Sequence, residues 1–364
     1  MPVSTQPFAI AACLLVSLGF APGLSGSASA LEPGIITTFA GKGALGYSSG
    51  GFSGDGGPAS EAGISNPRCA AVDGAGNVYF IDYFNRRIRK IDVSTDPPTI
   101  TSVAGGGNDA YAEGVPAVSV RLVFPEDLAV DKAGNVYIAE PGAHVVLKVD
   151  AGKGTISRVA GNYSRWQAED GVQATLSSLK NPVGVSVDGD GNVYVADEHA
   201  HSVKRVDAVT GIINTIAGNG SSYGPFRDGV DATRTSILFP KDVAVDGSGN
   251  VYVIELAGAR SRLRKVDART GKISTIKGSP SDAAEVSAAP DGSLCVTGAD
   301  RVYRVDPGTG KVAVIAGNGK KGYSGDGGPA AGAALGSPHG AVSDGINLYI
   351  ADTENNRIRR VRLK

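Results

Sequence analysis

An excess of charge of either sign is missing from this sequence. Its 35 Lys and Arg residues are matched by 36 Asp and Glu residues, which gives a net charge of −1. Proteins that bind nucleic acid through its phosphates need a strong basic excess, so this balance argues against a nucleic-acid partner. Long apolar runs are also missing after residue 30, and no later segment approaches the roughly 20 apolar residues that span a bilayer as a helix. We therefore expect neither nucleic-acid binding nor a membrane span.

Glycine, in contrast, is abundant, with 52 residues among 364. So much glycine lowers the helix propensity of the whole chain, and it lacks the three-residue period of collagen. A hydrophobic content of 41% is too high for a disordered chain. The composition therefore predicts a turn-rich, mostly β globular protein.

The first thirty residues have the pattern of a secretory signal peptide. The apolar run over residues 8–21 is too short to cross a bilayer, and Ala-Ser-Ala at residues 28–30 is the small-x-small pattern that precedes cleavage. We therefore expect residues 1–30 to be removed, which leaves a secreted, extracellular chain of residues 31–364; a retained membrane anchor is the alternative. In a eukaryotic secretory pathway, the sequons at Asn162 and Asn219 would be glycosylated.

One motif recurs along the chain at intervals of 57 or 58 residues. Val-Asp-x-x-Gly-Asn-Val-Tyr begins at Val72, Val130, Val187 and Val245, and degraded copies follow at residues 289–295 and 344–349. Such self-similarity is typical of stacked supersecondary units. Each copy contains four strand-like runs, here called a to d, with a tight Gly-Asn turn between a and b.

The order of these runs predicts a closed ring. Six runs of type d exist, and the first, residues 35–41, precedes every other run, while none follows the last a-b-c set. The N-terminal run can therefore pair with the last set and close the ring, which protects the sheet edges. We predict an all-β fold: a six-bladed β-propeller closed by the N-terminal strand.

The repeat resembles a known family. Asn-Pro-x-Gly-x-x-Val-Asp-x-x-Gly-Asn-Val-Tyr-x-Ala-Asp at residues 181–197, and Asn-x-Arg-Ile at residues 355–358, are similar to the NHL repeat. The loop at residues 322–330 resembles one common in exported NHL proteins. The resemblance covers essentially the whole chain after residue 30 and implies the propeller fold. It implies little about function, because this fold carries enzymes, sensors and adhesive modules alike.

Propeller geometry indicates where the loops lie. Strand a lines the central channel, and the d-to-a and b-to-c connections emerge on one face, here called the top face. Five d-to-a connections contain an acid-Gly pair 12 residues before a Pro, and we expect that acid to cap a short helical turn. The acids are Asp55, Glu113, Asp170, Asp228 and Asp326. The connection at residues 278–283 is short, so we expect a gap in the rim at blade 5.

The candidate site lies at the top of the channel. Asp127, Asp242 and Glu285 should point into its mouth, with His339 close by. Three carboxylates around one axis repel unless they are protonated or share a cation, and such oxygen ligands suit Ca²⁺. The alternative is a solvated polar channel without metal. Cys69 and Cys295 lie on blades separated by blade 6, so we expect two buried free thiols and no disulfide.

Two further sets of residues are interpreted as structural. The first comprises the acids that end five b strands, and we expect them to bind backbone amides or basic residues of the same blade. They are Asp82, Glu140, Asp197, Glu255 and Asp352. The second comprises the Arg-rich c strands around residues 86–90 and 357–362, which we interpret as solvated blade edges.

Two functions from different classes fit these observations. The first is a secreted, monomeric, non-catalytic module that binds a protein, glycan or small molecule through its top face. The second follows from a resemblance to the gluconolactonase and strictosidine-synthase group of propellers. It is a divalent-metal-dependent hydrolase or lyase in which Asp127, Asp242 and Glu285 hold the ion. A purely structural extracellular module is a third reading. The sequence favours the non-catalytic role.

Overall fold

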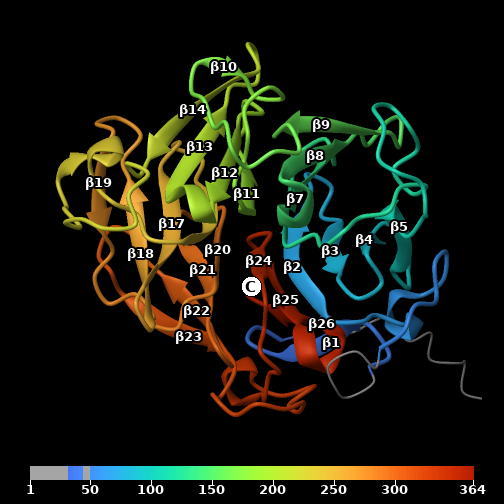
Figure 1. The fold of residues 1–364 in the computed structure, drawn as a ribbon. Helices are drawn as coiled ribbons and strands as arrows, with labels where there is room; N and C mark the ends of the chain where they lie inside the picture. Colours follow the sequence, from blue (N-terminus) through green and yellow to red (C-terminus); the bar gives the residue numbers. More distant parts are fainter. Residues whose placement is uncertain (1–31, 44–49) are drawn as a thin grey trace, which may run out of the picture. The chain divides into compact units, whose positions relative to one another are not determined.

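The computed structural model describes residues 32–43 and 50–364. Residues 32–364 belong to one compact unit, in which six antiparallel sheets are arranged around a central channel (Figure 1). This arrangement confirms the predicted six-bladed β-propeller. Within the described residues, no helix has the length and apolar character needed to cross a membrane.

Each blade has four strands in the order a to d from the channel outward. Blade 1 consists of β2 (Pro67–Val72), β3 (Val78–Asp82), β4 (Arg87–Asp92) and β5 (Thr99–Gly105); blade 2 of β6 (Asp127–Val130), β7 (Val136–Glu140), β8 (Val145–Val149) and β9 (Ile156–Ala160); blade 3 of β11 (Pro182–Val187), β12 (Val193–Asp197), β13 (Ser202–Val206) and β14 (Ile212–Ala217). Blade 4 consists of β16 (Pro240–Val245), β17 (Val251–Ala257), β18 (Arg260–Val266) and β19 (Lys272–Thr275); blade 5 of β20 (Glu285–Ala288), β21 (Leu294–Thr297), β22 (Val302–Val305) and β23 (Val312–Ala316); blade 6 of β24 (Ala341–Ser343), β25 (Asn347–Asp352), β26 (Arg357–Arg362) and β1 (Ile36–Ala40).

Strand β1 closes the ring as predicted. It pairs antiparallel with β26, with Ile36 opposite Val361, and so supplies the outermost strand of blade 6. The side chains of Ile36, Phe39 and Ala40 are buried. First and last strands therefore share one sheet, and the hydrophobic burial of the N-terminal strand holds the last blade to the first residues of the unit.

Apolar contacts between neighbouring blades make up the core. Ile81 and Ile88 of blade 1 pack in one cluster with Leu128 and Ile138 of blade 2. Each blade contributes the apolar positions of its b and c strands to both neighbours, so burying these faces requires the whole ring.

The recurring motif fixes the a-to-b turns through hydrogen bonds. Asp73 accepts bonds from the backbone amides of Ala75 and Asn77, and also from the Asn77 side chain and the Tyr79 hydroxyl. The Asn77 side-chain oxygen in turn accepts the amide of Val93 from the c-to-d turn. The motif thus satisfies the polar groups of two turns at the face opposite the top face, here called the bottom face.

The acid of each long d-to-a connection does not cap a helical turn, and that prediction was wrong. Short 3-10 turns do form in three connections, at η1 (Ala59–Glu61), η4 (Ala232–Arg234) and η5 (Ala330–Gly332), without side-chain caps. The acids bind strand cations because these are buried and need partners: Asp55 lies 2.7 Å from Arg89, and Asp326 lies 2.6 Å from Arg359. In blades 3 and 4, short strands β10 (Val172–Gln173) and β15 (Val230–Asp231) add to the outer edge.

The Arg-rich c strands are likewise not solvated edges. Arg89, Arg264 and Arg359 are fully buried, and each binds both the acid of the preceding d-to-a connection and the acid that ends strand b. The strand-b acids therefore have the structural role expected from the sequence. The remaining 3-10 turns follow these acids in the b-to-c loops, at η2 (Pro141–Ala143), η3 (Glu198–Ala200) and η6 (Thr353–Asn355).

Cys69 and Cys295, the two cysteines of the described residues, are buried free thiols, as predicted. Cys69 donates a hydrogen bond to the carbonyl of Leu128 in the next blade, at 3.3 Å. The short connection into blade 5 is also as expected, because β19 ends at Thr275 and β20 begins at Glu285.

Candidate functional site

Asp127 and Asp242 lie at the top of the channel, as predicted, and are almost completely buried. One oxygen of Asp127 accepts the amide of Leu128, and the other accepts the amide of Val185 in the next blade at 2.6 Å. The start of strand a places each carboxylate beside the neighbouring strand a.

Asp242 repeats this arrangement two blades further on. Its oxygens accept the amides of Val243 at 2.7 Å and of Val286 in the next blade at 2.6 Å. Both carboxylates therefore join adjacent blades. Together with Glu285 they form the group here called the carboxylate ring.

Ion pairs join the alternate blade junctions near the carboxylate ring. Glu285 of blade 5 binds His339 before blade 6, with 2.9 Å between Glu285 Oε1 and His339 Nδ1. Two further pairs occupy the junctions between blades 1 and 2 and between blades 3 and 4. They are Arg68 with Glu126, at 2.5 Å, and Lys241 with Glu198. Each of the four site residues predicted from the sequence thus contacts a neighbouring blade.

In blades 3 and 6, glycine stands at the position near strand a that Asp127 and Asp242 occupy in blades 2 and 4, because no side chain fits there. A Cβ on Gly340 would lie 2.5 Å from the Cα of Cys69 and 2.6 Å from Glu285 Oε2, and one on Gly184 would lie 2.8 Å from the Cα of Asp242. The top of the channel is therefore packed tightly.

Burial and mutual repulsion shift the protonation of this group. Burial and the charge of Glu285 raise the pKa of Asp127 to about 7. Burial, together with the charges of Asp127 and Glu285, raises the pKa of Asp242 well above its usual range. Burial lowers the pKa of His339, but its hydrogen bond to Glu285 and the charge of that carboxylate outweigh the burial and leave it raised. The raised pKa values of Asp127 and Asp242 thus favour a protonated, neutral form of these two carboxyl groups.

The donor set does not fit the Ca²⁺ ion that the sequence suggested. The two aspartates direct their oxygens at backbone amides, and Glu285 directs Oε1 at His339, so the oxygens do not converge on one point. In the part of the chain that the structure describes, no three His, Cys, Asp or Glu side chains are grouped to hold a metal ion.

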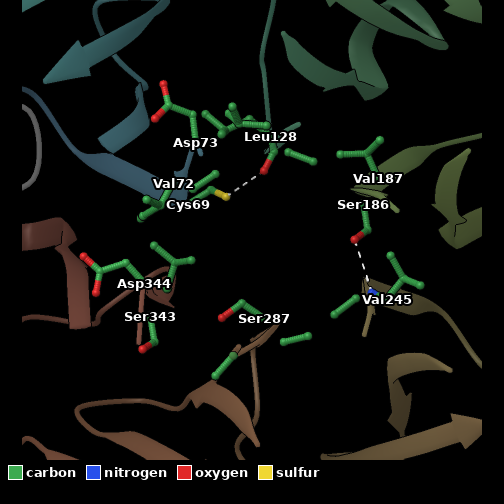
Figure 2. A pocket seen from close by; sticks show the side chains of 18 of the residues that line it. Cys69, Val72, Asp73, Leu128, Ser186, Val187, Val245, Ser287, Ser343 and Asp344 are labelled. Atoms are coloured by element: carbon green, nitrogen blue, oxygen red, sulfur yellow. Dashed lines mark hydrogen bonds between the residues drawn. The ribbon is translucent and has the colours of Figure 1, made fainter. Parts of the chain in front are cut away.

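A cavity of about 720 Å³ occupies the channel below the carboxylate ring. Its wall consists mainly of valine, alanine and serine residues of the a strands, among them Ser186 and Ser287, and continues to the a-to-b turns at Asp73 and Asp344 (Figure 2). The upper residues of this wall are buried, whereas turn residues such as Ile346 are exposed. The cavity therefore opens at the bottom face, and His339 does not line it.

Aspartate titration at the carboxylate ring should make stability depend on pH. The unfolded pKa of Asp is about 3.9, and the pKa of Asp127 is raised to about 7, so the folded protein holds a proton that the unfolded chain has lost between these values. This contribution is complete below about pH 4 and is lost as the pH rises through about 7. Relative to the Asp127→Asn variant, the wild type should thus lose free energy of unfolding between about pH 4 and pH 8, as measured by urea denaturation.

The exposed Asp150 provides the control for this experiment. Hydrogen bonds to the Lys153 and Gly152 amides lower its pKa, so the Asp150→Asn comparison should not show that loss as the pH rises. A difference between wild type and Asp127→Asn that stays constant over this range would contradict the assigned titration.

The top face carries an unusual set of exposed aromatic side chains. Eight large aromatic residues are exposed among the described residues, and every one lies in a d-to-a connection, in a b-to-c loop or beside the start of strand a. They are Phe52, Phe84, Phe124, Tyr163, Trp166, Tyr223, Phe226 and Phe239. Several stack against arginines, for example Phe52 under Arg87 at 3.9 Å. Aromatic and Arg side chains are enriched at protein interfaces.

The sequence did not predict this aromatic surface. Its members are spread over residues 52–239 and follow no spacing of their own, and only the assignment of loops to the top face brings them together. The signal that was available is the location of these Phe, Tyr and Trp residues between strand-like runs rather than within them.

The two sequons lie among the described residues, in different surroundings. Asn219 is exposed, whereas the Asn162 amide donates to the carbonyl of Leu176 at 2.7 Å; glycosylation of either residue stays a prediction. The proposed signal peptide, residues 1–30, lies outside the described residues.

Sequence comparison identifies the repeat. The model of the NHL repeat matches residues 179–205, which span β11, β12 and most of β13 in blade 3. The recurring motif places the same unit around the ring. The chain is an NHL-repeat β-propeller.

The curated relatives of this NHL-repeat propeller are much longer proteins. Teneurin-1 of Mus musculus is 30% identical over 237 residues, which cover 57% of this chain and 8% of the teneurin. Protein SUPPRESSOR OF QUENCHING 1, chloroplastic, of Arabidopsis thaliana is 24% identical over 293 residues, which cover 72% of this chain and 27% of that protein. The chain therefore matches a small part of either relative.

Solved propellers share the fold of this NHL-repeat protein at low identity. An auxiliary nutrient binding protein from Bacteroides thetaiotaomicron superimposes with a TM-score of 0.59 at 16% identity, covering 90% of this chain and 76% of that one. A gluconolactonase from Xanthomonas campestris superimposes with a TM-score of 0.55 at 15% identity, covering 83% and 87%. Such identities show a common fold and nothing further.

Proposed function

We propose that this NHL-repeat propeller is a secreted, non-catalytic binding module that takes a protein partner on its top face. The observation that carries the proposal is the confinement of all eight exposed aromatic residues of the described chain to that face. Exposed aromatic groups beside arginines supply the large, partly polar contacts that dominate protein interfaces. The extracellular location rests on the leader pattern of residues 1–30.

The carboxylate ring supports a structural rather than a catalytic role. Both oxygens of Asp127 and of Asp242 already accept backbone amides, and these bonds join adjacent blades. A general base must reach a substrate proton, and a metal-dependent enzyme needs converging ligands. The alternative function is a divalent-metal-dependent hydrolase or lyase. This chain shares the fold of the gluconolactonase, but its carboxylate oxygens do not converge in the way that a metal-dependent enzyme requires.

The test is a binding screen of purified residues 32–364 against an array of extracellular proteins. We expect at least one specific partner, and about a tenfold or larger loss of affinity for the triple variant Trp166→Ser, Tyr223→Ser, Phe239→Ser, because several hot-spot contacts are removed at once. The matched control replaces exposed apolar residues of the bottom face, Val209→Ser and Ile346→Ser, and should retain binding. Loss of binding in the control alone would assign the interface to the bottom face and refute the proposal.

A further inference from the structure

Blades 1, 4 and 6 each bury an arginine between two acids, and blade 3 buries a lysine beside one acid. In blade 6, Arg359 reaches Asp352, which ends strand b, at 3.2 Å and Asp326 of the preceding connection at 2.6 Å. The guanidinium or ammonium group thereby neutralises a fully buried carboxylate. The corresponding cations of blades 1, 3 and 4 are Arg89, Lys204 and Arg264.

Blade 2 keeps the buried acid but lacks the cation. Arg359 is the seventh residue after Asp352, and the seventh residue after Glu140 is Leu147. Glu140 is 2% exposed, and one of its oxygens accepts the amide of Val123 at 2.9 Å. Its other oxygen has no hydrogen-bond partner. A buried carboxylate with an unpaired oxygen is costly, so this residue needs an explanation that the fold itself does not provide.

A cavity of about 520 Å³ lies beside Glu140. Its buried wall contains Glu140 and Leu147, and the partly exposed rings of Tyr111 and Tyr163 line it closer to solvent, with 6.1 Å between their centroids. Space, aromatic faces and an unpaired acid thus coincide where the other blades place the end of a long cationic side chain.

The charges around this cavity are mixed, and Glu140 is the buried acid among them. Glu113, the acid of the blade 2 connection, is 3.9 Å from Arg158, which lies over the ring of Tyr163. Asp109 and Arg121 belong to the exposed rim, where solvent screens both charges. Arg158 already has partners, so Glu140 is the carboxylate that a ligand would meet.

We propose that the blade 2 pocket, formed by Glu140, Leu147, Tyr111 and Tyr163, binds a guanidinium group supplied from outside the chain. A planar guanidinium donates two parallel hydrogen bonds to a carboxylate and stacks on aromatic rings. An ammonium group binds a carboxylate as a point charge, without this paired geometry and without stacking. Blades 1, 4 and 6 use arginine in the equivalent place. The pocket shares Tyr163 with the aromatic set of the top face, but Glu140, Leu147 and Tyr111 lie outside that set, so guanidinium binding can be tested separately from the protein partner.

The raised pKa of Glu140 makes cation binding at this pocket depend on pH. Burial raises the pKa of Glu140 to about 7, although hydrogen bonds from the Val123 and Phe124 amides act in the opposite direction. A cation bound beside this carboxylate would favour its charged form. The ligand should therefore bind the ionised form of Glu140, and its affinity should fall as the pH drops below about 7.

The test is a saturation-transfer NMR titration of residues 32–364 with Nα-acetyl-arginine methylamide. The matched probe is the citrulline analogue, which has the same shape without the charge. We expect the arginine probe to bind at least about tenfold more tightly than the citrulline probe, since a charge-assisted pair is lost. Equal binding of the two probes, or no binding of the arginine probe, would overturn the proposal.

Two variants locate the site. Glu140→Gln keeps the shape of the side chain and should weaken the arginine probe about tenfold or more without loss of folding, because it removes an unpaired buried charge. Leu147→Arg supplies the guanidinium from within the chain and should abolish probe binding. Asp109→Asn removes one rim charge and should leave affinity within about twofold. Retained affinity in Glu140→Gln would refute the site.

A third arm separates the two sources of a guanidinium group. The tripeptide acetyl-Gly-Arg-Gly-amide should bind at least as well as the single residue if the natural ligand is an arginine on a protein segment. Binding of the single residue but not of the tripeptide would support the same site with a free small-molecule ligand.

Discussion

Replacing Arg359 by Ala should destabilise the propeller by about 3–5 kcal/mol, the range found when one partner of a buried ion pair is removed. The side chain of Arg359 is fully buried, and it donates to Asp352, which is also fully buried, to Asp326 and to the carbonyl of Ser324. Without the guanidinium, Asp352 keeps a charge that water cannot reach. Urea unfolding of residues 32–364, followed by circular dichroism, measures the change.

The control is the exposed ion pair between Arg205 and Asp207. Its atoms are 3.2 Å apart, similar to the Arg359–Asp352 distance, but both side chains are about one third exposed. Arg205→Ala should therefore cost only about 0–1 kcal/mol. If both variants lost the same amount, burial would not be the source of the effect.

Removing β1 should have a larger effect still. A chain that begins at Lys42 loses the outer strand of blade 6 and exposes the partners of Ile36 and Phe39. Truncating such residues to Ala alone costs about 2–5 kcal/mol each, and the total stability of a domain is only about 5–15 kcal/mol. We therefore expect the truncated chain to lose its cooperative unfolding transition in thermal melts.

Addition of the missing strand in trans provides the control. A synthetic peptide of residues 32–43 should restore the transition, and the same peptide with Ile36→Asp should not, because a charge would be placed in the core. A truncated chain that unfolds cooperatively at the temperature of the full unit would contradict the role assigned to ring closure.

The sequence predicted the fold well because the fold depends on order and period. The spacing of the Asp-Asn-Tyr motif and the N-terminal extra strand were sufficient to predict six blades and the closure through residues 35–41. These features do not depend on the position of any single atom. Because Asp127 and Asp242 each follow the Pro of their repeat by two residues, the repeat also placed both beside the channel.

The contacts of the candidate residues could not be predicted in this way. Whether Asp127 meets a cation or the amide of Val185 depends on the approach of two strands that are distant in the sequence. Arg89 was assigned to a solvated blade edge because strand c lies towards the blade rim and the chain carries almost no net charge. Its partner Asp55 precedes it by 34 residues. A signal was nevertheless present, since acids ending b strands precede an Arg or Lys by seven residues in four blades.

Two kinds of contact alternate between neighbouring blades near the carboxylate ring. Ion pairs join blades 1 to 2, 3 to 4 and 5 to 6, whereas backbone amides accepted by Asp127, by Asp242 and by the carbonyl of His339 join blades 2 to 3, 4 to 5 and 6 to 1. The inner ring thus repeats every two blades, with threefold pseudosymmetry. Insertion or deletion of one blade would place two like junctions side by side, so a viable change in blade number in this lineage should come in pairs.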